Sequence, residues 1–357
     1  MQKIVLKIGT NVLTGPDGLL DTDAVGRIAT QIAGLKQQGL SIVLVSSGAV
    51  GAGRALVQLP KETGRVVQRQ VMAAVGQIKL MGIYVEQFAR HGLLCAQVLA
   101  TKEDFRDRRH YLNMQNCFAA LLRDNIIPIV NENDVISVSE LMFTDNDELA
   151  GLVAALIDAQ GLVILSNVDG VFDGPPGQPG SHLISGIRPG ERLHAGFVQP
   201  QKSSFGRGGM MTKFRFAQKA ARLGITTWIA NGKRPDVLSD ILIKGVPVGT
   251  CFHAQAALKQ RKRWLAHGDP ARKGSVTINE GAEQALRERV SSLLPVGVLR
   301  VEGDFEKGDL VQIVGEKGEP VGLGKARFGA EAARKMIGQK GKKPLVHYDY
   351  LYLFGEK

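Results

Sequence analysis

The sequence predicts an α/β fold, a three-layer αβα sandwich with a mostly parallel sheet, followed by a small mostly-β C-terminal domain. Short apolar runs rich in Val, Ile and Leu alternate with helical segments up to about residue 231. Continuous apolar runs suit strands that are buried on both faces, and alternation with helices is typical of a parallel sheet. Beyond residue 274 the pattern changes to short strands and turns, which indicates a small β domain.

Each element of the predicted sandwich has its own signal. Apolar runs indicate strands at 3–9, 41–48, 93–99, 125–131, 162–167 and 225–231. Helical segments lie between them, at 23–38, 64–90, 103–124, 146–159 and 210–223. Most of the strands end in small or polar residues, and ligands of open α/β sheets bind outside the carboxyl ends of the strands. We therefore expect the functional site at this edge of the sheet.

A basic segment at 259–273 separates the two predicted domains, 1–258 and 274–357. The chain has 357 residues and 44% hydrophobic content, which suits two globular domains. The segment contains six Lys and Arg residues and a Gly-Asp-Pro turn, as interdomain linkers do. The C-terminal domain has enough apolar residues for a core of its own: Val276, Ile278, Leu293, Leu294, Val298, Leu299, Val311, Ile313, Val346, Leu351 and Leu353.

The cysteine, histidine and hydropathy patterns exclude several classes of protein. Cys95, Cys117 and Cys251 are far apart, and the seven histidines show no HxxxH spacing. We expect three buried, inert thiols, and neither structural zinc nor a disulfide framework. The chain also lacks an apolar run long enough for a signal peptide or a membrane-spanning helix. We therefore expect a cytoplasmic protein with no membrane partner.

The net charge of +11 suggests anionic partners, and its distribution is uneven. Residues 124–187 include ten acidic residues and no Lys or Arg, whereas 201–234 include eight basic residues and no acidic one. A site for a metal-bound polyphosphate beside a cationic substrate group needs both kinds of lining. Two solvated faces of opposite charge are the alternative.

The segment SFGRGGMMTKFRFAQ, at 204–218, places three glycines ahead of a lysine and a helical segment. Glycines allow backbone N–H groups to approach an anion, and the start of a helix adds free donors and a positive dipole end. The segment fits neither GxxxxGK[ST] nor GxGxxG. On its own, the pattern leaves a phosphate-binding loop and an ordinary surface loop open.

Five stretches together resemble the amino-acid kinase superfamily, and within it the glutamate 5-kinase family: KIGTNVLT, SSGAVGAGR, NENDVI, TDNDELA and GRGGMMTK. Members of that family use ATP to phosphorylate the γ-carboxylate of L-glutamate. The product is L-glutamyl 5-phosphate, and the reaction is the first step of proline biosynthesis. The resemblance extends through essentially the whole chain, because 274–355 resembles the PUA domain of many bacterial members. It favours a phosphate-binding role for the glycine-rich loop.

The resemblance assigns catalytic roles residue by residue. Lys7 and Lys213 match lysines that stabilise the transferring phosphoryl group, and phosphoryl transfer depends mainly on positioning and charge stabilisation. Asp147 matches an acidic catalytic position, where two roles are open: orienting the two lysines, or holding Mg²⁺ through water. We expect MgATP as the phosphoryl donor and assign no residue as a direct metal ligand, because Mg²⁺ uses few protein carboxylates.

The resemblance also implies two binding sites. The positions that match the glutamate site are Ser47, Gly48, Asn131, Asp134 and Asn146, of which Asp134 is expected to pair with the α-ammonium group. The positions that match the ATP site are Lys7, Gly9, Ser166, Asn167, Arg207, Gly208, Gly209, Met210, Met211, Thr212 and Lys213. The chain departs from the family pattern at Asn167, where many members have Asp, and at Arg207 and Met211, which replace smaller residues.

Two other interpretations compete with this one. NEND and the C-terminal domain speak against another kinase of the superfamily, such as acetylglutamate kinase, aspartokinase or uridylate kinase. An RNA-binding protein built on the PUA domain is disfavoured because 274–357 has 13 basic and 12 acidic residues, too even a balance for a phosphate-backbone footprint. The same charge balance makes a nucleic-acid partner unexpected. The resemblance further implies a homo-oligomer, a dimer or tetramer, with proline as feedback inhibitor.

Overall fold

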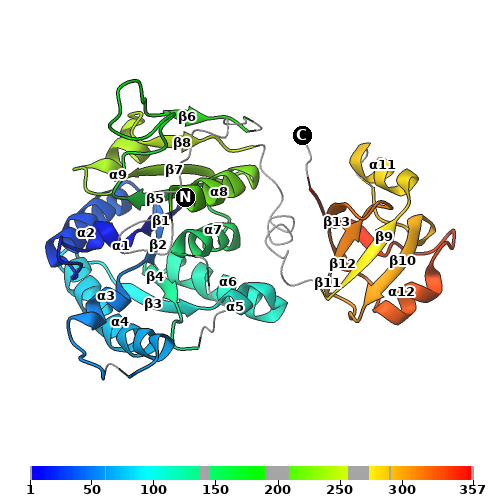
Figure 1. Ribbon diagram of the computed structural model, residues 1–357, viewed down its shortest axis with the longest axis horizontal. Helices are drawn as coiled ribbons and strands as arrows, with labels where there is room; N and C mark the ends of the chain where they lie inside the picture. The colour runs from blue at the N-terminus through cyan, green and yellow to red at the C-terminus, as the bar shows by residue number, and fades with distance from the viewer. Residues whose placement is uncertain are drawn as a thin grey trace. The chain divides into compact units, whose positions relative to one another are not determined.

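The computed structural model describes residues 2–60, 62–136, 143, 145–189, 191, 209–255, 273–288 and 291–354. The chain divides into two compact units, Met1–Ala257 and Leu258–Lys357, and each unit has its own sheet (Figure 1). The basic segment predicted as a linker lies outside the described residues, except for Lys273.

The first unit contains an eight-stranded sheet in the order β3-β4-β2-β1-β5-β7-β8-β6. Its strands are β1 (Lys3–Ile8), β2 (Ser41–Ser46), β3 (Cys95–Ala100), β4 (Ile127–Glu132), β5 (Gly161–Ser166), β6 (Gly186–Ile187), β7 (Thr226–Asn231) and β8 (Thr250–Phe252). Neighbouring strands in the described sheet are parallel, except that β7 pairs antiparallel with β8. The predicted α/β class and mostly parallel sheet are therefore confirmed.

Helices cover both faces of this sheet (Figure 1). One layer contains α1 (Thr10–Leu13), α2 (Thr22–Gln37), α3 (Ala49–Arg54), α4 (Arg65–Ala89), α9 (Val237–Ser239) and the π-helix η1 (Asp240–Lys244). The other contains α5 (Lys102–Arg106), α6 (Arg108–Arg123), α7 (Asn146–Leu156) and α8 (Met210–Arg222). No helix in the described part of the chain is both long and apolar enough to cross a bilayer.

The single helix predicted at 103–124 is wrong, because the chain forms two helices that meet at Asp107. This residue has an extended backbone (φ −73°, ψ 124°), which ends α5. Its side chain accepts a hydrogen bond of 2.8 Å from His110 N and so caps α6. Asp is a strong N-cap residue, and its preference for this position outweighs the continuous helical pattern.

The two faces of β1 determine where the site lies. Leu6 and Ile8 pack in the core with α2 and α4, so Lys3 and Lys7 point to the opposite face. On that face, Lys3 Nζ donates to the carbonyl of Ile157, at the C-terminal end of α7, at 3.0 Å. Lys7 reaches the first turn of the same helix. β1 therefore contacts both ends of α7 through lysines four residues apart.

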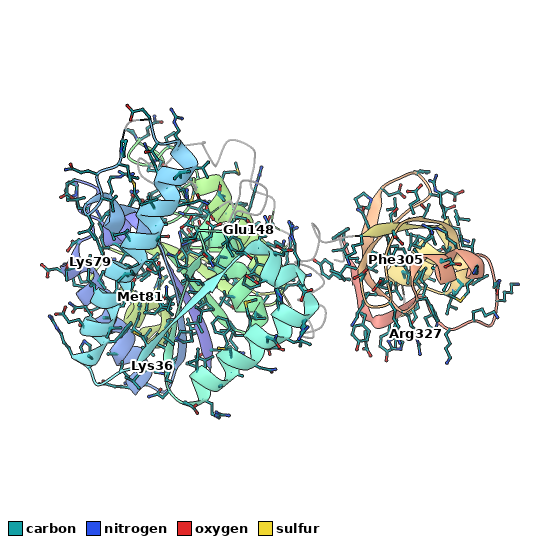
Figure 2. The ribbon with its side chains drawn as sticks, turned by 90° about the horizontal axis from the view of Figure 1, so that it is seen from below. Lys36, Lys79, Met81, Glu148, Phe305 and Arg327 are labelled. Carbon is teal, nitrogen blue, oxygen red and sulfur yellow. The ribbon has the colours of Figure 1, made fainter. Side chains whose placement is uncertain are left out.

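The second unit is a small, mostly-β domain with a five-stranded sheet in the order β10-β9-β11-β12-β13. Its elements are β9 (Gly274–Ile278), α11 (Glu280–Glu288), the 3₁₀ helix η3 (Pro295–Gly297), β10 (Val298–Gly303), β11 (Leu310–Val314), β12 (Pro320–Ala326), α12 (Ala330–Met336) and β13 (Val346–Leu353). Phe305, labelled in Figure 2, lies in its apolar core.

The prediction that Leu294 and Leu299 belong to the core of this unit is wrong, because their side chains are 44% and 45% exposed. Leu299 lies where the pairing of β10 with β9 shifts register, between Val298 and Arg300. A bulge of this kind redirects a side chain, and it turns Leu299 outward. Leu294 immediately precedes the 3₁₀ helix η3.

The expectation of three buried thiols is also wrong for one residue. Cys117 is exposed on α6, whereas Cys95 and Cys251 are partly buried. The buried side of α6 contains Tyr111, Phe118 and Leu122, and Cys117 lies off this apolar stripe. Burial raises the pKa of the Cys95 thiol, and that of Cys251 to about 11.

Candidate active site

Three charged side chains meet between β1, α7 and α8. Lys7 Nζ lies 2.6 Å from Asp147 Oδ1. Lys213 Nζ donates to Asp147 Oδ2 at 2.8 Å. The Lys7 and Asp147 side chains are 5% and 0% exposed, and that of Lys213 is 12% exposed. The fold therefore brings together the three residues that the sequence groups as catalytic, and we call them the lysine-aspartate cluster.

The electrostatics of this cluster favour an ionised carboxylate between two amines. Burial alone would raise the pKa of Asp147, but the charges of Lys7 and Lys213 and their hydrogen bonds lower it to about 2. Burial lowers the pKa of Lys7, against the attraction of Asp147. Burial also acts against the charge of Lys213, but Asp147 outweighs it and raises the pKa of this lysine. Asp147 thus holds two amines next to each other, and amines in this arrangement can stabilise negative charge on a bound anion.

Asp145 precedes the cluster and caps α7. Its Oδ1 accepts hydrogen bonds from Asp147 N at 2.8 Å and Glu148 N at 3.3 Å. Its Oδ2 is buried and has no hydrogen-bond partner in the described part of the chain. Burial and the charge of Asp147 raise the pKa of Asp145 to about 6. Asp145 is not among the residues predicted from the sequence, although an Asp directly before a helical run is a recognisable N-cap signal.

A salt bridge fixes the same end of α7 to the neighbouring helix. Glu148, labelled in Figure 2, lies one residue after Asp147 on the first turn of α7. Its Oε1 is 2.7 Å from Lys102 Nζ, at the start of α5.

Among the described residues, no group of three or more His, Cys, Asp or Glu side chains has the arrangement of a metal site.

Asn146 connects the carboxyl ends of β2 and β4. Its Nδ2 donates to Ser46 O at 2.8 Å, to Ser47 Oγ at 3.1 Å and to Asn131 Oδ1 at 3.0 Å. Asn131 Nδ2 in turn donates to Gln77 Oε1 on α4 at 2.9 Å. The structure thus links three residues of the predicted glutamate site, Ser47, Asn131 and Asn146. Gln77 was missed because a single amide in the middle of a helix gives no sequence signal.

Glycines shape the turn that presents Ser47. Gly48 has φ 107°, in the left-handed region that favours glycine, and begins α3. Gly76 lies on α4 where a Cβ atom would collide with the carbonyl oxygen of Ala49. The backbones of α3 and α4 therefore approach closely, and this contact places Gln77 beside the end of β2 and β4.

Asp134 is held by Arg69, a residue of α4 that no sequence motif indicates. Its Oδ1 accepts hydrogen bonds from Arg69 Nε at 3.1 Å and from Arg69 Nη2 at 2.7 Å. The same Nη2 is 3.9 Å from Glu132 Oε2. Gln70, the next residue of α4, donates to Val135 O at 2.8 Å. The N-terminal part of α4 therefore positions the segment after β4 that contains Asp134.

The predicted phosphate-binding loop is described only in part. Arg207 and Gly208 lie outside the described residues. Gly209 is the N-cap of α8, and its carbonyl accepts from the amides of Thr212 and Lys213, both at 3.2 Å. Met210 and Met211, which lie between Gly209 and Thr212, are partly buried.

The other predicted nucleotide residues lie at the ends of β1 and β5. Gly9 N donates to Leu165 O at 3.0 Å, so the chain after β1 lies against the end of β5. Ser166 is buried there, and Asn167 is exposed. The sheet thus places Gly9 and Ser166 at the carboxyl edge that also contains Lys7.

The chain is similar to known proteins in sequence and in fold. Residues 2–231 match the amino acid kinase family, and residues 274–348 match the PUA domain. The chain is 50% identical to the glutamate 5-kinase of Chlorobaculum tepidum over 354 residues, 99% of this chain and 97% of that protein. It is 49% identical to the glutamate 5-kinase of Bacteroides thetaiotaomicron over 354 residues, 98% of each chain. A solved isopentenyl phosphate kinase of T. acidophilum shares the fold, with 18% identity and a TM-score of 0.51, over 71% of this chain and 100% of that one.

Proposed function

We propose the reaction of this chain from the premise that it belongs to the amino acid kinase family, and within it to the glutamate 5-kinases. The chain transfers the γ-phosphoryl group of ATP to the side-chain carboxylate of L-glutamate. The products are ADP and L-glutamyl 5-phosphate, and the reaction is the first step of proline biosynthesis. The observation that carries this proposal is the lysine-aspartate cluster at the carboxyl edge of the sheet.

The chemistry requires charge stabilisation and no general base. An oxygen of the glutamate side-chain carboxylate attacks the γ-phosphorus, and the bond from that phosphorus to the β–γ bridging oxygen breaks. The attacking carboxylate is already ionised at neutral pH. Lys7 and Lys213 stabilise negative charge on the transferring phosphoryl group, and Asp147 holds both amines in position.

The residues present fit a magnesium ion bound together with ATP. Mg²⁺ keeps several waters and typically takes one or two protein carboxylates besides substrate phosphates, whose charge it neutralises. Each oxygen of Asp147 lies within salt-bridge distance of a lysine amine, at 2.6 Å from Lys7 Nζ and 2.8 Å from Lys213 Nζ. Asp145 Oδ2 is buried and has neither a lysine nor a hydrogen-bond partner in the described part of the chain. We therefore assign Asp145 to the ion, directly or through water, and Asp147 to the lysines.

The two substrates occupy different parts of the carboxyl edge. Glutamate lies with its α-ammonium group at Asp134, in a pocket shaped by Ser47, Gly48, Asn131 and Asn146. ATP lies with its phosphates at the start of α8 and at Gly9, where the N-terminal amides of the helix and the two lysines favour anions.

We also propose that proline inhibits the reaction by binding where the α-carbon end of glutamate binds. Proline has the α-carboxylate and the α-ammonium group of glutamate, but it lacks the side-chain carboxylate that accepts the phosphoryl group. It therefore competes for the Asp134 end of the pocket without becoming a substrate. Inhibition that is competitive with glutamate, and that is weakened in Asp134→Ala, is the expected result.

The active form is a homo-oligomer. Apolar side chains are exposed on α4, where Ile78 and Val85 are 78% and 52% exposed, and on the adjacent edge strand β3, where Leu99 is 41% exposed. Exposed apolar patches and unpaired strand edges favour association. Light scattering of the wild-type chain should give the mass of a dimer or tetramer. Ile78→Glu should reduce this mass, whereas Val246→Glu, an exposed apolar residue elsewhere, should leave it unchanged.

A substrate panel tests the proposed reaction. MgATP is incubated with L-glutamate, L-aspartate or N-acetyl-L-glutamate, and hydroxylamine traps any acyl phosphate as a hydroxamate. Glutamate should give the signal, because Asp134 recognises a free α-ammonium group that the acetylated compound lacks. An equal signal from N-acetylglutamate would refute the assignment.

A further inference from the structure

Arg69 holds Asp134 with only part of its guanidinium group. Its Nε and Nη2 both donate to Asp134 Oδ1, and Nη2 also faces Glu132 Oε2 at 3.9 Å. In the described part of the chain, neither Arg69 Nη1 nor Asp134 Oδ2 has a hydrogen-bond partner. The Arg69 side chain is 31% exposed and that of Asp134 is 8% exposed. The pair therefore presents two N–H donors of a cation and one oxygen of an anion next to each other.

An α-amino acid presents the complementary arrangement. Its ammonium and carboxylate groups are bonded to the same carbon, so a site that reads both needs an anion and a cation side by side. Neighbouring cations at this edge of the sheet are engaged elsewhere, because Lys7 and Lys213 bind Asp147, and Lys102 binds Glu148. Arg69 retains free donors, and a guanidinium group suits planar carboxylates.

We propose that Arg69 is a specificity-determining residue, which binds the α-carboxylate of the substrate through Nη1 while Asp134 binds the α-ammonium group through Oδ2. The bond between Arg69 and Asp134 persists in the complex and sets the spacing of the two charges. This inference rests on the proposed function, since it assigns the α-carbon end of glutamate. It adds a substrate contact from α4, whose sequence contains none of the predicted substrate-binding residues.

Two substrate analogues separate the two halves of this recognition. 4-Aminobutanoate keeps the phosphoryl-accepting carboxylate and the amine of glutamate but lacks the α-carboxylate. Glutarate keeps both carboxylates but lacks the amine. For each compound, kcat/KM is measured in the hydroxamate assay, or the inhibition constant against glutamate where turnover is too slow.

The two variants should lower kcat/KM for different sets of compounds. Arg69→Gln should lower kcat/KM for glutamate on the order of 10- to 100-fold, the range for a lost charge-assisted hydrogen bond, mainly through KM. For 4-aminobutanoate the value should stay within about threefold of wild type, because no α-carboxylate contact is lost. Asp134→Asn should lower the values for glutamate and 4-aminobutanoate but spare glutarate.

Two further variants make the test selective. Arg65→Gln removes the same charge from an exposed position one turn earlier on α4, and it should change none of the values. Arg69→Lys retains the charge but not the planar fork, so it should give a smaller loss that is again confined to glutamate. If Arg69→Gln does not fold, the same comparison of glutamate with 4-aminobutanoate is made with Arg69→Lys.

Other outcomes would overturn the proposal. Equal losses for glutamate and 4-aminobutanoate in Arg69→Gln would mean that Arg69 only positions Asp134. An unchanged or improved glutamate KM would mean that Arg69 makes no favourable contact with the substrate. Failure of the wild-type chain to phosphorylate glutamate is a different result, because it would refute the proposed function itself.

Discussion

The two units of the molecule differ in what they bury. Among the described residues, the charged side chains buried in the first unit are Lys7, Glu132, Asp134, Asp147 and Asp240. In the described part of the second unit the buried side chains are apolar, except for Thr277. A buried charge costs several kcal/mol in desolvation unless it is paired, so its presence needs a reason. The contrast supports the proposal that the chemistry lies in the first unit, whereas the second unit is stabilised by an apolar core of its own.

The largest effect is expected from removing one amine of the lysine-aspartate cluster. Lys7→Ala and Lys213→Ala should each lower kcat on the order of 10² to 10³, the scale for losing one preorganised charge-stabilising group. The control is Lys3→Ala, on the same strand and face as Lys7 but at the other end of α7, which should retain kcat. Steady-state hydroxamate assays measure all three. Near-normal kcat in both cluster variants would contradict the assigned roles.

The next effect concerns stability and pH in the first unit. Asp145 has its pKa raised to about 6 in the folded chain, from an ordinary value of 3.8, by burial and by Asp147. As the pH rises from about 4 to 6, the unfolded chain loses this proton before the folded chain does, so folding is progressively disfavoured. Asp147, with its pKa near 2, does not titrate in this window.

Asp145→Asn removes this titration and keeps a good N-cap for α7. Its free energy of unfolding, relative to that of wild type, should therefore rise between about pH 4 and pH 6, by up to about 3 kcal/mol, and stay level above this range. Urea unfolding at several pH values measures the difference. A difference in unfolding free energy that does not vary with pH would show that the pKa of Asp145 is not raised in the folded chain.

A smaller effect is expected at the substrate end of the site. Asp134→Ala should raise the KM for glutamate by on the order of 10- to 100-fold and change kcat less, because the α-ammonium contact exists in both the ground and transition states. Initial rates over a range of glutamate concentrations separate the two parameters. An unchanged KM would remove Asp134 from the substrate site.

Sequence reasoning predicts what depends on periodicity. The apolar runs identify the central strands and the parallel sheet, because a strand buried on both faces needs a continuous apolar run. The three-residue strand β8 was missed since so short a segment has no period to detect. Leu299 was predicted to be buried because the bulge in β10, which breaks the alternation of buried and exposed residues, leaves no mark in the sequence. The end of α5 at Asp107 was missed because Asp107 caps α6 within an otherwise continuous helical pattern.

The candidate site shows a similar division. Lys7, Asp147 and Lys213 lie in motifs of the family, and the fold joins them through one carboxylate. Arg69 and Gln77 lie on a long helix without a motif, and only the tertiary packing of α4 against the strand ends brings them to Asp134 and Asn131. Contacts of this kind depend on helix packing and side-chain reach, which a single sequence does not specify.

The smallest effect, and the most direct test of the contrast between the units, comes from a chain truncated after Ala257, assayed beside the full-length chain. Each of the two forms is also made with Lys213→Ala. If the first unit contains the complete site, the truncated chain should be folded and retain glutamate-dependent phosphoryl transfer within about tenfold of the full chain, a barrier change of ~1.4 kcal/mol. Lys213→Ala should lower kcat by the same factor in both forms. A folded truncated chain with no activity would contradict the account, because it would show that the second unit completes the active site.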